Sequence, residues 1–173
     1  MSFDLPIPTL ETERLILRQP QERDLEGLIA FWGSERAQFI GGPLSRLDTW
    51  RKLTSMIGQW VIKGYGFYML EEKSSGEVVG GLGIVDAEGW SEPELGWNLY
   101  EAAEGKGYAF EAAQKVREHA AATWGITAPI SHIDAGNTRS IALAERLGAT
   151  FERNGDISGH PVRIYRHAEW EVS

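Results

Sequence analysis

A short glycine-rich segment, Gly105 to Ala109, lies between an expected strand and the start of the most regular helical pattern in the chain. Glycines let the backbone turn tightly and come close to a ligand, and the free N–H groups and dipole of a helix start attract an anion. The segment therefore predicts a site for a phosphate or pyrophosphate. The alternative, which the motif alone does not exclude, is that small residues here only begin a helix and pack it closely on a sheet.

Two common nucleotide-binding folds are disfavoured by the residues around this segment. The glycine spacing does not match a Walker A loop, and no Lys-Ser or Lys-Thr pair ends it. A dinucleotide-binding fold would need a third glycine and a βαβ unit at the N-terminus, and the sequence has neither. A phosphate-binding domain for some other nucleotide stays open as an interpretation.

Polar residues that could move protons follow further along the chain. His132 and Asp134 alternate with Ile133 on an expected strand, so their side chains share one face and could form a His–carboxylate pair. A hydrogen-bonded polar pair that only supports the sheet is the alternative. Asn137 and Ser140 then lead into a short helix, and side chains of these types commonly cap a helix start.

The composition limits the classes of protein to which the chain can belong. It has 173 residues, of which 42% are hydrophobic and 24% charged, so disorder, collagen-like repeats and coiled coils are disfavoured. The absence of cysteine excludes disulfides, thiolate zinc sites and a cysteine nucleophile, and we expect no metal. The net charge of −8 disfavours a nucleic-acid partner and weakly favours a cationic one. With no signal peptide and no membrane-spanning apolar run, we expect a cytoplasmic protein without a membrane partner.

The elements that must position these residues follow from hydrophobic periodicity and from glycine, proline and serine breaks. The expected order is β α α β β β α β α β β, a mixed α/β class in which helices cover a sheet. The three strands over 67–72, 78–86 and 92–99 form an antiparallel meander. Of the other four expected strands, three cover 15–18, 130–134 and 162–170, and one lies between the last helix and 162; the helices cover 22–32, 48–63, 109–124 and 141–147.

Four motifs in this order resemble the GNAT acyltransferase superfamily, and within it the Rim-type branch that includes ribosomal-protein alanine N-acetyltransferases. Leu10 to Arg18 is similar to the opening strand of that branch, and Glu94 to Trp97 is similar to its fourth strand. Gly105 to Ala109 resembles the acetyl-CoA pyrophosphate motif, and Asn137 to Gly148 resembles the second CoA motif. The resemblance implies one GNAT domain over residues 1–173, of α/β (α+β) class. Its mixed, mostly antiparallel sheet would be splayed between strands 4 and 5, with helices on both faces.

The resemblance also implies acetyl-CoA as the acetyl donor. In the family, backbone N–H groups of the segment matching Glu104 to Ala109 hold the pyrophosphate. The pantetheine arm pairs with the strand edge near Trp97 to Leu99, and an Asn matching Asn137 bonds that arm. Glu104 departs from the family, which usually has Arg or Gln there, and we expect its carboxylate to face solvent because a pyrophosphate would repel it. The implied cofactor-binding residues are Trp97, Leu99, Glu104, Gly105, Lys106, Gly107, Tyr108, Ala109, Asn137 and Ser140.

For catalysis the resemblance implies direct transfer, with a base for the amine and an acid for the departing thiolate. Many members have a Tyr where this chain has Ala144, so Ser140, similar to the proposed general acid of the Rim-type branch, is the matching proton donor. The alternative for Ser140 is a place in the hydrogen-bond network of the helix start. Glu94 resembles the fourth-strand acid of the family and is the first candidate base, followed by His132 and Asp134.

These implications together predict an N-acetyltransferase that moves an acetyl group from acetyl-CoA to a primary amine of a peptide N-terminus or a small molecule. By resemblance, the loop over 39–44 and its flanking helices form one wall of the acceptor groove, and His160 and 163–167 are further candidates to line it. The alternative is a non-catalytic acyl-CoA-binding or sensing module, which Ala144 and Glu104 would suit. The predicted partners are acetyl-CoA and an amine acceptor, with room for a homodimer.

Overall fold

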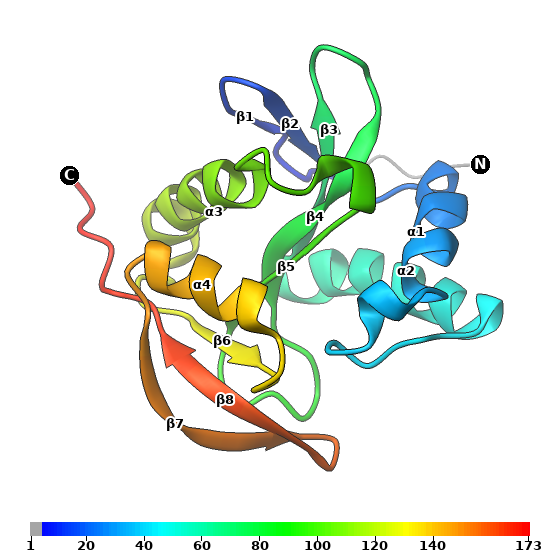
Figure 1. The fold of residues 1–173 in the computed structure, drawn as a ribbon. Helices are drawn as coiled ribbons and strands as arrows, with labels where there is room; N and C mark the ends of the chain where they lie inside the picture. The colour runs from blue at the N-terminus through cyan, green and yellow to red at the C-terminus, as the bar shows by residue number, and fades with distance from the viewer. Residues whose placement is uncertain (1–4) are drawn as a thin grey trace.

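Eight strands form one sheet in the computed structural model, which describes residues 5–173 (Figure 1). The strands are β1 (Leu10–Glu11), β2 (Leu15–Arg18), β3 (Phe67–Glu72), β4 (Val78–Val85), β5 (Glu94–Leu99), β6 (Ile130–Ile133), β7 (Thr150–Ile157) and β8 (His160–Arg166). The helices are α1 (Leu25–Trp32), α2 (Arg46–Lys63), α3 (Tyr108–His119) and α4 (Thr138–Arg146). Short helical turns are η1 (Glu22–Asp24), η2 (Glu35–Ala37), η3 (Glu101–Ala103) and the π turn η4 (Ala120–Trp124).

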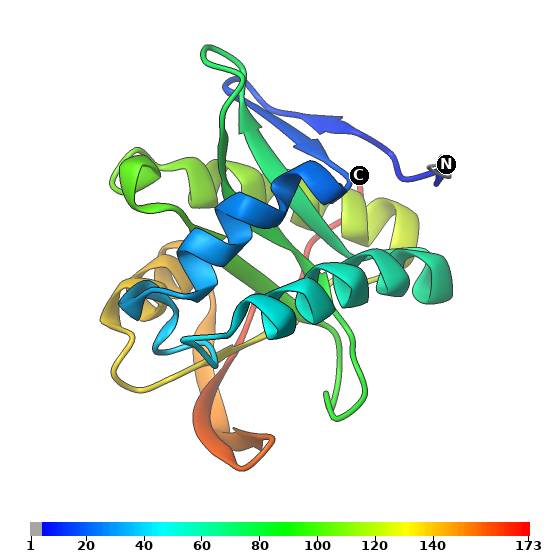
Figure 2. The same cartoon turned by 90° about the vertical axis from the view of Figure 1, so that its right-hand side faces the viewer.

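Helices cover both faces of the sheet. The strand order is β1-β2-β3-β4-β5-β6-β8-β7. Helices α1 and α2 lie on one face, and α3 and α4 lie on the other (Figures 1 and 2). Within the described part of the chain, every helix is too short or too polar to cross a lipid bilayer.

The sheet opens between β5 and β6. All other neighbouring strands among the described residues pair antiparallel, whereas β5 and β6 are parallel and are joined at a single register pair, Glu94 with Ile130. Past this pair the two strands diverge, so the edge of β5 from Leu95 to Leu99 has no strand partner on that side (Figure 1). This confirms the predicted splayed, mostly antiparallel sheet. The opening lies between the fourth and fifth strands of the predicted order, because β1 is an additional two-residue strand.

Residues at its two ends determine the length of α2. The Ser45 side chain accepts a hydrogen bond from the Asp48 N–H, so the helix begins at Arg46, two residues before the predicted start. Gly64 takes a left-handed conformation with φ of 78° and ends the helix where the sequence predicts. Ser45 and Gly64 therefore set the two ends of α2, which lies along one face of the sheet (Figure 2).

The C-terminal strand ends earlier than the predicted 162–170. β8 begins at His160, in a hairpin with β7, and ends at Arg166. The His167 N–H still donates to the Pro129 carbonyl at 3.0 Å. Proline has no N–H to return a second bond, so the regular ladder with β6 stops at this point.

Three clusters of apolar side chains form the core of the described residues, and the smallest, around α4, β6 and β8, contains Ile133, Ala144, Ala149 and Tyr165. Between the sheet and α3, the small side chains of Ala112 and Ala113 let the helix approach the strands, where Leu82 and Ile84 of β4 are fully buried. The second cluster, under α1 and α2, contains Leu28, Phe31, Trp32, Ala37, Leu53 and Met69. β5 pairs along its whole length with the buried strand β4. This pairing holds β5 in place, while its opposite edge from Leu95 to Leu99 stays without a strand partner among the described residues.

We expect the substitution Ile84→Val to lower the free energy of unfolding by about 0.5–1.5 kcal/mol, because it removes one methylene from a fully buried side chain. Ile62→Val is the matched control: Ile62 is 80% exposed on α2, and its change should stay within about 0.5 kcal/mol. Urea unfolding of both variants measures the difference. Equal midpoints would contradict the place of Ile84 in the core.

Candidate functional site

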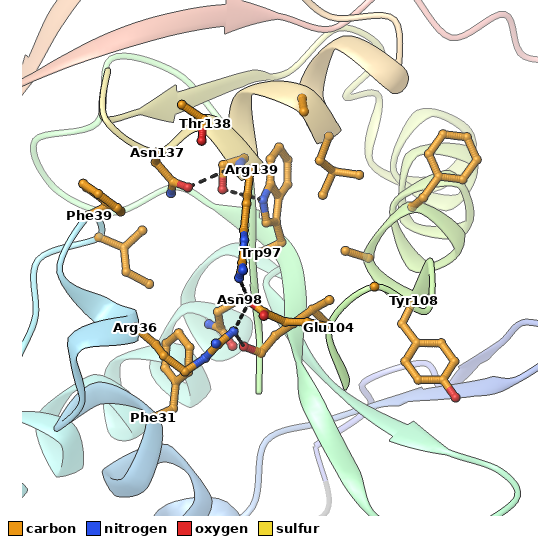
Figure 3. A pocket seen from close by; sticks show the side chains of 18 of the residues that line it. Phe31, Arg36, Phe39, Trp97, Asn98, Glu104, Tyr108, Asn137, Thr138 and Arg139 are labelled. Atoms are coloured by element: carbon orange, nitrogen blue, oxygen red, sulfur yellow. Dashed lines mark hydrogen bonds and ion pairs between the residues drawn. The ribbon is translucent and has the colours of Figure 1, made fainter. Parts of the chain in front are cut away.

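A pocket of about 860 Å³ opens beside the free edge of β5 (Figure 3). We call it the first pocket. Four parts of the chain line it: β5 from Trp97 to Leu99, the segment from Glu104 into α3, the start of α4, and the residues around η2. Trp97, Leu99, Glu104, Gly105, Gly107, Tyr108, Ala109, Asn137 and Ser140 from the sequence prediction line this pocket, and Lys106 does not.

The glycine-rich segment forms the wall of the first pocket where α3 begins. Gly105 and Gly107 take left-handed conformations, with φ of 74° and 79°, in which a side chain would be strained. The N–H groups of these two residues donate to no other group within residues 5–173. Two free N–H groups beside a helix start attract an anion, as the sequence predicts for this segment.

Arg14, just before β2, holds this segment in position. Its Nη1 donates to the Lys106 carbonyl at 2.8 Å, and its Nε donates to Glu111 at 2.7 Å. Burial opposes ionisation of Glu111, but hydrogen bonds from Thr12 and Arg14 outweigh this effect and lower the pKa of the carboxyl group. This role of Arg14 was not predicted from the sequence. Its partners lie 92 and 97 residues away, so no local pattern indicates the contact.

Glu104 does not face solvent as predicted. Its side chain is 28% exposed and turns into the first pocket, where one carboxylate oxygen accepts hydrogen bonds from Arg36 and Arg139 (Figure 3). The hydrogen bond from Arg36 holds the pKa of Glu104 below its usual value, against the effect of burial. Two guanidinium groups therefore surround one carboxylate, and the local charge is positive. The prediction assumed an uncompensated carboxylate, which this part of the pocket does not contain.

The Ser140 hydroxyl lies at the open edge of β5. Its Oγ accepts a hydrogen bond from the Trp97 indole N–H at 3.1 Å. The start of α4 is capped by other atoms, because the Asn137 side chain accepts from the Ser140 backbone N–H at 3.3 Å (Figure 3). Ala144 is fully buried and lines neither this pocket nor the second one described below. Of positions 140 and 144, only Ser140 offers a hydroxyl to the pocket.

A second pocket, of about 520 Å³, meets the first where β5 and β6 separate. Residues of α2, the loop after β4, β5, β6 and the β7–β8 hairpin line it. The residues common to both pockets are Phe39, Ile40, Trp97, Asn98, Asn137 and Ser140. Phe39 and Ile40 belong to the loop that the sequence predicts as a wall of the acceptor groove. The Ser140 hydroxyl thus lies at the junction of the two pockets.

Glu94 and His132 form a polar cluster in the second pocket. Glu94 accepts hydrogen bonds from the Trp90 indole N–H at 2.6 Å and from the His132 backbone N–H at 2.9 Å. The His132 Nδ1 lies 3.0 Å from the Glu94 carboxylate, and the imidazole is 4% exposed. The carboxylate is thereby fixed beside the imidazole. This arrangement brings together two groups that the sequence treats as separate candidates.

Asp134 contacts a different histidine from the one that the strand pattern suggests. His132 pairs with Glu94, whereas Asp134 lies 3.1 Å from the His160 Nε2 of β8. The Gly136 N–H also donates to Asp134 and lowers the pKa of its carboxyl group. His132 and Asp134 both line the second pocket, but each is bonded to a partner from another strand or loop. His160 lines this pocket too, while residues 163–167 do not.

Comparison with known proteins matches most of the chain. The model of the acetyltransferase (GNAT) domain family matches residues 14–150. A solved structure of an acetyltransferase from Agrobacterium tumefaciens str. C58 superimposes with a TM-score of 0.88, at 35% identity, over 98% of this chain and 99% of that one. The N-acetyltransferase p20 of Bacillus licheniformis is 28% identical, over 85% of this chain and 84% of its own length.

The fold is also similar to that of RimL, a ribosomal L7/L12 alpha-N-protein acetyltransferase solved in complex with coenzyme A. That structure superimposes with a TM-score of 0.74 at 23% identity, over 93% of this chain and 96% of that one. At this identity the likeness concerns the fold. The matched range of 14–150 contains every residue that lines the first pocket, from Phe31 to Arg146, and so contains the junction with the second.

Proposed function

Because the chain belongs to the GNAT acetyltransferase family, we propose that it moves an acetyl group from acetyl-CoA directly to a primary amine, on a peptide N-terminus or a small molecule. The observation that carries this proposal is the meeting of the two pockets at Trp97, Asn137 and Ser140. A donor in the first pocket and an acceptor in the second would reach each other there. We also propose that residues 1–173 form a single domain of this family, which the match over 14–150 supports.

The residues of the first pocket fit acetyl-CoA. The free N–H groups of Gly105 and Gly107 suit its pyrophosphate, and the two arginines around Glu104 give that end a positive charge. The open edge of β5 offers backbone groups to an extended arm, which would pair as an added strand. When bound, acetyl-CoA supplies the reactive thioester. The chain's own contribution is to hold it with the acetyl group near Ser140.

We expect Arg14→Gln to raise the Kd of acetyl-CoA roughly threefold to tenfold, because the variant releases the Lys106 carbonyl and loosens the segment that holds the pyrophosphate. The rate constant kcat should change little, since Arg14 lies away from the pocket junction. Isothermal titration calorimetry measures the affinity. Arg23→Gln is the control, because Arg23 is an exposed arginine on η1 that contacts Gln21 and Glu71 and does not touch the glycine-rich segment. Equal affinities in the two variants would contradict the positioning role of Arg14.

The proposal gives the proton transfers to residues at and beside the pocket junction. Glu94, fixed beside His132, is assigned as the base that removes a proton from the amine, with His132 as its immediate partner. Since the Ser140 Oγ accepts from Trp97, its own proton is free to be donated to the departing sulfur. The chain has no cysteine to carry an acyl group, so the amine would attack the thioester directly.

A non-catalytic acyl-CoA-binding module is the second candidate function. The observation that favours it is Ala144, which supplies no proton donor and is buried away from both pockets. The two functions differ in one property: only the enzyme releases CoA thiol in the presence of an amine.

Amine-dependent thiol release tests the proposed function. Purified protein is incubated with acetyl-CoA alone and with a panel of amines and short peptides, and the thiol is measured with a colorimetric reagent. We expect slow release without an acceptor, and faster release with at least one amine, accompanied by the mass of its acetylated product. Binding of acetyl-CoA with no release for any amine would favour the binding module. Failure to bind acetyl-CoA would contradict both functions.

A further inference from the structure

Lys52 of α2 brings a positive charge to the second pocket. Its side chain is half-buried among the residues that line the pocket, and its Nζ lies 4.1 Å from the centre of the Trp32 ring. The lysine ion pairs within residues 5–173 are made by Lys63, Lys73 and Lys115. Lys52 has no carboxylate within ion-pair distance in this part of the chain. Its ammonium group is held mainly by an aromatic face.

Both carboxylates of the second pocket are already bonded. Glu94 accepts from Trp90 and from the His132 backbone, and Asp134 contacts His160 and the Gly136 N–H. Glu94 favours the charged form of Lys52, but from beyond the distance of an ion pair. Burial works in the opposite direction and lowers the pKa of Lys52. The pocket thus holds a partly desolvated cation and no free anion among its described residues.

Resting on the proposed function, we propose that Lys52 binds a carboxylate of the acceptor, so that the acceptor is an amine that also carries a carboxylate. A desolvated ammonium gains most from a charge-assisted hydrogen bond to an incoming anion. The amine of the same molecule points to the pocket junction at Ser140. Free amino acids and peptides with an acidic side chain near the N-terminus both present this pair of groups.

The walls of the pocket agree with such an acceptor. Apolar and aromatic side chains line the pocket together with Lys52, including Trp32, Met56, Phe67 and Trp90, and they suit an apolar body between the two charged groups. The net charge of −8 attracts an ammonium group and repels a carboxylate, so it does not steer a zwitterion as a whole. Lys52 is therefore the group that distinguishes such an acceptor from simple amines, at close range.

The first test compares acceptors that differ only in the carboxylate. Leucine and phenylalanine are assayed against leucinamide and phenylalaninamide, and amidated Ala-Asp is assayed against amidated Ala-Asn. We expect kcat/KM to favour the carboxylates in at least one set by about tenfold or more, in line with a charge-assisted contact. The set that shows the preference separates a free amino acid from a peptide acceptor. Faster or equal acetylation of the neutral member in every set would overturn the proposal, while leaving the acetyltransferase function intact.

The variant Lys52→Met tests the residue itself, because it keeps the aliphatic stem against Trp32 and removes the charge. We expect it to abolish the preference for the carboxylate, mainly through KM, with little change for the neutral amides. Arg51→Met is the matched control: it removes a positive charge from the adjacent residue, which is exposed and does not line the pocket. A preference that survives in Lys52→Met would overturn the proposal.

A binding measurement keeps the inference testable without turnover. N-acetyl-leucine and N-acetyl-phenylalanine carry the carboxylate of the expected products, and their carboxamides do not. In the presence of CoA, calorimetry should show tighter binding of the acids by the wild-type protein and no preference in Lys52→Met. If the acids bind more tightly but no amine is acetylated, Lys52 recognises a carboxylate and the proposed acetyltransferase activity is contradicted. Equal binding of the acid and the carboxamide in every pair, with amidated N-acetyl-Ala-Asp and N-acetyl-Ala-Asn included, would overturn the role of Lys52.

Discussion

Replacing Ser140 with alanine is expected to lower kcat by about 10²–10⁴-fold, the usual contribution of a positioned proton donor, while the Kd of acetyl-CoA stays within about threefold of wild type. The two effects differ because the backbone N–H and the hydroxyl of Ser140 make different contacts. Its backbone N–H completes the cap of α4 with Asn137, and alanine keeps that bond. Its hydroxyl is the group at the junction of the pockets, and alanine removes it. Steady-state rates with a saturating amine, together with calorimetry of acetyl-CoA, measure both effects.

Ser140→Thr is the matched variant, because it keeps a hydroxyl at the same position. We expect it to retain more activity than Ser140→Ala, with any loss reflecting the added methyl group. Trp97→Phe removes the indole N–H that bonds the hydroxyl and should lower kcat less than Ser140→Ala does. An unchanged kcat in Ser140→Ala would exclude the hydroxyl from the chemistry and leave Ser140 with the backbone role at the start of α4.

Replacing Glu94 with glutamine is expected to lower kcat/KM by about 10²-fold or more, because the variant removes the charge that holds His132 and accepts a proton. Glutamine has nearly the same shape, and its carbonyl can still accept from Trp90 or from the His132 backbone. We therefore expect the loss in kcat/KM to be larger than any change in the free energy of unfolding could cause. The pH–rate profile is the measurement. We expect an acidic limb in the wild-type profile and none in the profile of the variant.

Glu92→Gln is the control for Glu94→Gln. Glu92 lies two residues earlier, pairs with Arg166 and Arg153, and lines neither pocket. We expect its kcat/KM to stay near that of the wild type. If Glu94→Gln kept both the wild-type rate and the wild-type acidic limb, Glu94 would not be the base, and His132→Gln would be the next variant to measure.

Much of the fold could be predicted from the sequence because local features determine it. The strand over 67–72 and the end of α2 at Gly64 lie where the turn residues Ser74 to Gly76 and the glycine at 64 predict them. The glycine-rich segment could be placed at a helix start for the same reason. Helix starts were less accurate. Helices α2 and α4 begin two and three residues before the predicted starts at 48 and 141, because the side chains of Ser45 and Asn137 cap them there.

The contacts within the site could be predicted only in part, because most of them join distant segments. The strand pattern predicts that His132 and Asp134 share one face and could pair with each other, but their partners come from β5 and β8. The prediction for Glu104 was wrong because Arg36 and Arg139 are 68 and 35 residues away. The sequence gives no local sign of the roles of Arg14 and Lys52, since both depend on side chains that only the folded chain brings near.

The central claim is that acetyl-CoA occupies the first pocket, between the start of α3 and the open edge of β5. Amide hydrogen exchange with and without acetyl-CoA tests it most directly, because the N–H groups of Gly105 and Gly107 have no partner in the described structure and one edge of β5 from Leu95 to Leu99 has no strand partner. We predict slower exchange at Gly105 to Ala109 and at Trp97 to Leu99 when acetyl-CoA is added, with α2 unchanged. If saturating acetyl-CoA slowed exchange in neither segment, or slowed it only in α2, acetyl-CoA would not occupy the first pocket.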